Sequence, residues 1–165
     1  MAWIDPKTYE TASPEAQKLI DDNGKGLLNS AKVCLELNNA AVLQCVEING
    51  WRMDDEIAKV LGKKIGDIFE YAISVGNKSF NCTRYFTKVI KERYGIDDLE
   101  TADLTDRERL AVEFAFAVTK DFHNIPEDLK ERMNKEFTQE EIVVLMGEAA
   151  VMTADNIIET LLDVR

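Results

Sequence analysis

Two N-terminal capping boxes, each opening a long segment of helical periodicity, constrain the fold of this chain more than any other feature. Thr105 and Thr138 are each followed three residues later by a glutamate, Glu108 and Glu141. In such a box the hydroxyl accepts a bond from the third backbone N–H of the helix, and the glutamate reaches back to the cap. The apolar residues after the second box keep helical spacing for about six turns. The pattern predicts two long helices in the second half of the chain.

Shorter helices are predicted for the remainder, between local start and stop signals. Ser13–Pro14 caps the first of them, Asn49–Gly50 ends another, Asp54–Asp55 opens the next, and Gly95 ends a helix that begins near Ser79 or Asn81. No segment has the alternation of a strand. We therefore predict an all-α fold, a single domain over residues 1–165 built as a bundle of roughly seven or eight helices.

The charge balance and the cysteine content exclude several classes of protein. With 20 basic and 31 acidic side chains the chain carries a net charge of -11, which disfavours nucleic acid and anionic membranes as partners. No apolar run is long enough to span a bilayer, and the first ten residues lack the features of a secretory signal. Three cysteines without a C-x-x-C pair do not form a disulfide framework. We expect a cytoplasmic protein.

Metal and cofactor sites are not indicated by any motif. The chain has a single histidine, His123, and no Cys/His cluster, which excludes a structural zinc site. We assign no metal ligand and no cofactor, although carboxylate-only metal sites stay open on this reasoning. The acidic run Asp54–Glu56 is interpreted as a solvated first turn of a helix. Cys34 and Cys45, among apolar neighbours, are expected to be packing residues.

Cys82 differs from the other cysteines because it falls in the predicted first turn of a helix. Unpaired backbone N–H groups there stabilise a thiolate, and Lys78 and Arg84 lie nearby in sequence. The preceding helix carries Asp67 and Glu70, and a carboxylate beside a thiol is a plausible proton relay. On the residues alone, a packed core cysteine and a reactive thiol both stay open.

Four stretches resemble the carboxymuconolactone decarboxylase-like family, in its alkylhydroperoxidase D-like branch. They are "SPEAQKLI", "DIFEYAISVGNKSFNCTRYFT", "LTDRERLAVEFAFAVTKDFHNIP" and "FTQEEIVVLMGEAAVMTADNIIETL". The resemblance covers about Ser13 to Leu162. It implies an all-α fold assembled as a homotrimer or homohexamer. In redox members it implies a glutamate followed by Cys-x-x-Cys-x-x-x-His, which reduces peroxides through a disulfide cycle.

The chain departs from that motif. The favoured register places Asp67 at the glutamate, Ser79 at the first cysteine, Cys82 at the second and Phe86 at the histidine. An alternative register puts Cys82 first and Glu70 at the glutamate, with Tyr85 at the second cysteine. Either way the dithiol is lost, and phenylalanine cannot transfer protons.

Three functions follow as hypotheses. The first is a divergent family member with a one-cysteine thiol oxidoreductase or peroxidase activity, in which Cys82 and Asp67 are catalytic and an external thiol resolves the intermediate. Its pocket would be lined by Ser79, Tyr85, Phe86 and Glu70. The second is a non-enzymatic oligomeric or small-molecule-binding protein on the same fold. The third, a lactone decarboxylase-type lyase, is the least favoured, because the histidine is missing and the net charge repels an anionic lactone.

Overall fold

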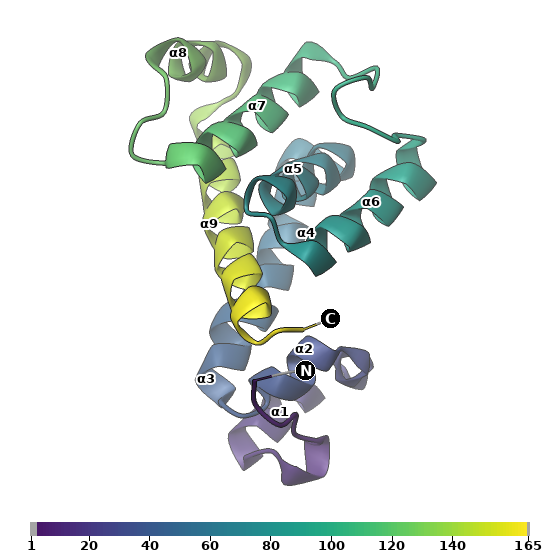
Figure 1. The fold of residues 1–165 in the computed structure, drawn as a ribbon. Helices are drawn as coiled ribbons and strands as arrows, with labels where there is room; N and C mark the ends of the chain where they lie inside the picture. Colours follow the sequence, from purple (N-terminus) through teal and green to yellow (C-terminus); the bar gives the residue numbers. More distant parts are fainter. Residues whose placement is uncertain (1–2, 165) are drawn as a thin grey trace.

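The computed structural model describes residues 3–164, and all regular structure in that range is helical (Figure 1). This confirms the predicted all-α class. In chain order the helices are α1 (Pro14–Asn23), α2 (Ala31–Glu36), α3 (Ala40–Val42), α4 (Asn49–Leu61), α5 (Lys63–Gly76), α6 (Phe80–Tyr94), α7 (Asp106–Asp121), α8 (Glu127–Glu136) and α9 (Gln139–Leu161). Short 3₁₀ turns lie at Tyr9–Thr11 and Lys25–Asn29. Within the described range, no helix is both long and apolar enough to cross a bilayer.

The capping signals in the second half of the sequence are used as predicted. Thr105 and Thr138 accept bonds from the backbone N–H groups of Glu108 and Glu141, and both glutamates return a bond to the cap. At the other end of the chain, the Ser13 hydroxyl caps α1. Each of these signals depends only on residues three positions apart, which is why the sequence alone predicts them.

The region between α3 and α4 differs from the prediction. Asn49–Gly50 was expected to end a helix, but the chain stays helical from Ala40 to Leu61 through a π-helical stretch at Leu43–Ile48. A β-carbon on Gly50 would lie 3.7 Å from Val151 of α9, so this glycine sits inside a helix–helix contact. The packing of α4 against α9 outweighs the local tendency of an Asn-Gly pair to stop a helix, a preference worth about 1 kcal/mol for the glycine.

The buried apolar residues form two clusters. The larger one joins α4 to α9 and is centred on α5, whose Ile68, Phe69 and Ile73 are fully buried. Phe69 stacks on Phe114 of α7 with ring centroids 6.3 Å apart. The smaller cluster holds α1, α2 and the π-helical stretch together around Ile20. Figure 1 shows this N-terminal part at one end of the molecule, with α9 running beside α4.

The second half of α9 is the element against which the site is built. The turn between α5 and α6 is tied to it by Asn77, whose Nδ2 donates to Thr153 Oγ1 and Asn156 Oδ1 at 3.1 Å each. The start of α6 therefore faces polar side chains of α9, and Lys32 at the start of α2 pairs with Asp155 of the same helix.

Candidate functional site

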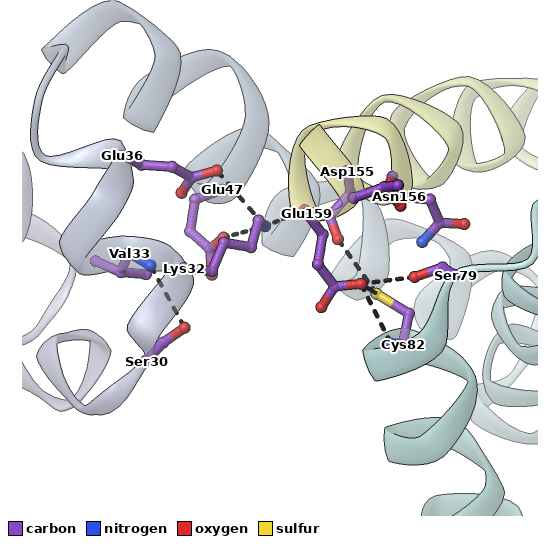
Figure 2. A network of polar contacts seen from close by, with 11 residues as sticks. Ser30, Lys32, Val33, Glu36, Glu47, Ser79, Cys82, Asp155, Asn156 and Glu159 are labelled. Atoms are coloured by element: carbon purple, nitrogen blue, oxygen red, sulfur yellow. Dashed lines mark hydrogen bonds and ion pairs between the residues drawn. The ribbon is translucent and has the colours of Figure 1, made fainter. Parts of the chain in front are cut away.

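Cys82 lies in the first turn of α6, as predicted, and is half-buried. Its partner is a residue that the sequence did not indicate, Glu159 of α9. Glu159 Oε2 accepts bonds from the Ser79 hydroxyl at 2.6 Å, the Cys82 backbone N–H at 3.3 Å and the Cys82 thiol at 3.2 Å (Figure 2). Asp155 Oδ2, one turn earlier on α9, lies 3.6 Å from the same sulfur. A carboxylate from another helix thus caps α6, and the Ser79 side chain does not.

The surroundings of the Cys82 thiol disfavour the thiolate, although its position at the start of a helix suggested that they would favour it. Burial raises the pKa of the Cys82 thiol above its ordinary value, and the negative charges of Asp155 and Glu159 raise it further. The backbone N–H of Cys82 at the helix start donates to the Glu159 carboxylate, so this donor does not support a thiolate. Lys78 and Arg84 are exposed. The thiolate support that the sequence suggested is not formed, because two carboxylates of α9 contact the sulfur and the basic neighbours in sequence point to solvent.

This environment predicts slow chemical modification of Cys82. At neutral pH we expect iodoacetamide to alkylate Cys82 about tenfold more slowly than the exposed Cys45, because the thiolate is the nucleophile. Mass spectrometry of a pH series on native protein measures the site-specific rates. In urea the three cysteines should react alike, which is the control. Equal native rates at Cys82 and Cys45 would contradict the structure.

Asp67 is not brought to Cys82. Its Oδ2 accepts bonds from Arg93 Nη1 at 2.8 Å and from the Tyr94 hydroxyl at 2.6 Å, both at the far end of α6. The sequence placed Asp67 and Cys82 on neighbouring helices, which is correct. It could not show that α5 turns this carboxylate toward the end of α6 and away from its beginning. A proton relay from Asp67 to Cys82 is therefore not formed.

A cavity of about 150 Å³ opens beside Cys82, between α4, α6 and α9. The predicted pocket residues Tyr85 and Phe86 line it, with their rings edge to face at 5.0 Å. Ser79 and Glu70 do not line it: the Ser79 hydroxyl donates to Glu159, and Glu70 is buried next to Asp54 and Glu148. The polar side chains of the lining are those of Lys32, Glu47, Asp54, Cys82, Glu148 and Asp155. A wider depression of about 570 Å³ adjoins the cavity and shares Glu47 and Trp51 with it.

Lys32 of α2 is the cation at the edge of this cavity. Its ammonium lies 2.5 Å from Glu47 Oε2 and 3.7 Å from Glu36 Oε1, and it also pairs with Asp155 (Figure 2). Burial opposes the charged form, but Asp155, Glu47 and Glu36 together raise the pKa of the Lys32 ammonium above its ordinary value. This cluster connects the N-terminal part of the molecule to α9, the helix that also holds Cys82.

Three carboxylates from three different helices meet beside the cavity, and two of them, Asp54 and Glu148, line it. Asp54 of α4, Glu70 of α5 and Glu148 of α9 each place a carboxylate oxygen within 4.8 Å of the other two. Asp54 was expected in a solvated first turn; the first-turn position is wrong, because Asp54 lies in the middle of α4, and its partly exposed side chain lines the cavity. The sequence did contain a signal for Glu148. The acidic residues Glu148, Asp155 and Glu159 are seven and four residues apart in α9, which places them on one face of the helix.

The pKa values of these carboxyl groups are raised, chiefly by burial. Burial and the charges of Asp54 and Asp155 raise the pKa of Glu148 to about 8. Burial and the charge of Asp155 raise the pKa of Asp54 to about 6, and burial and Asp54 hold that of Glu70 well above its ordinary value. Away from this cluster, burial raises the pKa of Glu36 to about 8, although Lys32 opposes the shift.

A pH dependence of stability follows from these shifts. Because the pKa of Glu148 is 4.5 in a solvated chain and about 8 here, the folded state binds more protons than the unfolded state across that interval. The free energy of unfolding should therefore fall as the pH rises from about 4.5 to about 8. Urea titrations at several pH values measure this. Glu148→Gln should add about 3 kcal/mol more stability at about pH 8 than at about pH 5, whereas the exposed Glu131→Gln should not. Parallel curves for the two variants would contradict the assignment.

Comparisons of the chain with models of protein families, with curated proteins and with solved structures find no match.

Proposed function

We propose that this chain is a small-molecule-binding protein whose cavity accepts a positively charged ligand. The observation that carries the proposal is the charge of the lining: four carboxyl groups, Glu47, Asp54, Glu148 and Asp155, face the single ammonium of Lys32. Because the pKa of Glu148 is about 8, Glu148 is mostly protonated at neutral pH, and the other three still outnumber Lys32. Lys32 is already paired with Glu47 and Asp155. The carboxylates in the lining leave negative charge that a cation would neutralise in a site of low dielectric.

The size and the walls of the cavity favour a small ligand. A cavity of about 150 Å³ holds a molecule of about the size of benzene. Trp51, Tyr85 and Phe86 line it with aromatic rings, and ring faces attract cations. A short diammonium such as butane-1,4-diammonium has this size and charge.

Calorimetric titration with butane-1,4-diammonium tests the proposal. We expect saturable binding at one site, weakened at least about tenfold by Asp155→Asn, which removes one carboxylate from the lining. Butanoate, of similar size and opposite charge, is the control ligand and should not bind. Equal heats for the two ligands, or no saturable binding of any cation, would contradict the proposal.

One-cysteine thiol chemistry is the second candidate, and the contact between Cys82 and Glu159 is the observation that favours it. With Sγ 3.2 Å from Glu159 Oε2, the carboxylate is placed to take the thiol proton. The sulfur would attack a hydroperoxide, cleaving the O–O bond to give a sulfenic acid and an alcohol. One external thiol would then form a mixed disulfide and release water, and a second would free Cys82. Thiol-dependent turnover of an alkyl hydroperoxide that Cys82→Ser abolishes would establish this candidate; the raised pKa of Cys82 leads us to expect none.

A second copy of the chain is the proposed protein partner. The exposed residues of α9 from Val143 to Leu161 are apolar, apart from Thr160, and recur every three or four residues, so they form one stripe along the helix. They are Val143, Met146, Ala150, Ala154, Ile157 and Leu161. A continuous apolar stripe of this kind is typical of a helix–helix interface.

We expect the chain to form an oligomer. The family resemblance implies a trimer or a hexamer. Met146→Glu with Ile157→Glu should dissociate it, because both changes place charge in the stripe. Phe122→Glu, at an exposed apolar position on another element, is the matched control. Light scattering that gives the 18.7 kDa monomer for the unaltered chain at micromolar concentration would contradict the expectation.

A further inference from the structure

We infer that Asp54, Glu70 and Glu148 form a binding site for a hard divalent cation of the Mg²⁺, Mn²⁺ or Ca²⁺ class. This inference rests on the proposed function in that both place positive charge in the same cavity. It goes further by naming the ligand class and the three side chains that hold it.

The spacing of the carboxylate oxygens fits a single ion. One oxygen from each residue lies within 4.8 Å of the other two. Two oxygens on opposite sides of a cation, each about 2.1 to 2.4 Å from it, are about 4.2 to 4.8 Å apart, and adjacent oxygens are closer. Carboxylate oxygens are also the ligands that hard divalent cations prefer. The three side chains thus need little rearrangement to share an ion.

The strongest observation is that Glu148 is buried without a partner. Its side chain is 0% exposed, and neither carboxylate oxygen has a hydrogen-bond partner among residues 3–164. Within the same range, no lysine or arginine makes an ion pair with Glu148, Glu70 or Asp54; Lys63 pairs with Asp67, and Lys32 with other carboxylates. A carboxylate removed from water without donors is costly, and a bound cation would supply the missing interaction.

The fold holds these side chains in place and gives access to them. Each ligand comes from a different helix, and α4, α5 and α9 pack against one another in all three pairs. The arrangement therefore does not depend on a mobile loop. Asp54 and Glu148 line the cavity, so an ion held there would present its remaining coordination positions to water or to a small ligand beside Cys82. Cys82 itself is not among the three ligands.

The test is a titration of chelator-treated protein with Mn²⁺, followed by electron paramagnetic resonance and by calorimetry. We expect one equivalent to bind, with competition by Mg²⁺ or Ca²⁺. Glu148→Gln and Asp54→Asn should each weaken binding at least about tenfold. Asp55→Asn, an exposed neighbour on the same helix, should bind as the unaltered chain does.

Thermal unfolding separates a ligand role from a structural one. Mn²⁺ should raise the melting temperature of the unaltered chain but not of Glu148→Gln, even though that variant should be more stable without metal. Asp54→Asn, at a less buried position, provides a second variant if Glu148→Gln does not fold. Lack of Mn²⁺ binding, or equal binding by the Asp54→Asn variant, would overturn the inference. If butane-1,4-diammonium binds but Mn²⁺ does not, this inference alone is overturned. If neither cation binds, the proposed function is overturned as well.

Discussion

Lys32→Met should lower the free energy of unfolding by about 3–5 kcal/mol near neutral pH, the cost typical of removing one partner from a buried ion cluster. The Lys32 side chain is 11% exposed, and its ammonium makes ion pairs with Glu47, Glu36 and Asp155. Glu36 is 0% exposed at its side chain and its carboxylate makes no hydrogen bond in the described part of the chain. Methionine keeps most of the length of the side chain and removes the ammonium, so the loss of stability measures the cost of leaving the carboxylates without a cation.

Urea denaturation at two pH values measures this effect. At about pH 9 the loss should be larger than near neutral pH, because the pKa of Glu36 is about 8, so Glu36 is ionised there and adds to the carboxylates, Glu47 and Asp155, that already need the cation at neutral pH. Lys18→Met is the matched control: Lys18 makes an ion pair of 2.7 Å with Asp22, but both side chains are exposed, so its loss should cost less than about 1 kcal/mol. Equal losses for the two variants would show that Lys32 is not the link that the structure describes.

The helices that the sequence predicts well are those whose boundaries depend on neighbouring residues. Thr105, Thr138 and Ser13 cap helices through bonds to backbone groups three residues on, and Gly95 ends α6 in the left-handed conformation. The prediction failed where a distant helix decides the outcome. Asn49–Gly50 reads as a stop signal, yet α9 packs against Gly50 and the helix continues.

The candidate site could be predicted only in part, for the same reason. Cys82 was placed correctly in a first turn, and Tyr85 and Phe86 do line a cavity with it. Its charge environment was not predictable, because Glu159 lies 77 residues further along the chain. The sequence shows that the acidic residues of α9 share one face of that helix. Only the packing shows their neighbours: Glu159 contacts α6, and Glu148 lies close to side chains of α4 and α5.

The contact between α5 and α7 leaves no room for a side chain at Gly76, and Gly76→Ala should therefore cost about 3 kcal/mol of stability. A β-carbon there would lie 2.0 Å from Thr119 Oγ1 and 2.7 Å from Thr119 Cβ. Rotation of the Thr119 side chain could relieve the first overlap at the loss of its bonds to the Ala115 and Phe116 carbonyls. The second overlap involves Cβ, which moves only with the backbone, so the two helices must separate.

A double-mutant cycle tests this origin of the effect. Thr119→Ala removes the nearest clashing atom but keeps the β-carbon, so it should recover part of the loss in Gly76→Ala and not all of it. Gly26→Ala is the control, since a β-carbon there has no atom within 4 Å and its backbone is not in the left-handed region; it should change stability by less than about 0.5 kcal/mol. If Gly76→Ala unfolds in urea like Gly26→Ala, α5 and α7 do not approach as closely as the structure describes. Because α5 also carries Glu70, a separation of these helices should weaken Mn²⁺ binding in the same variant.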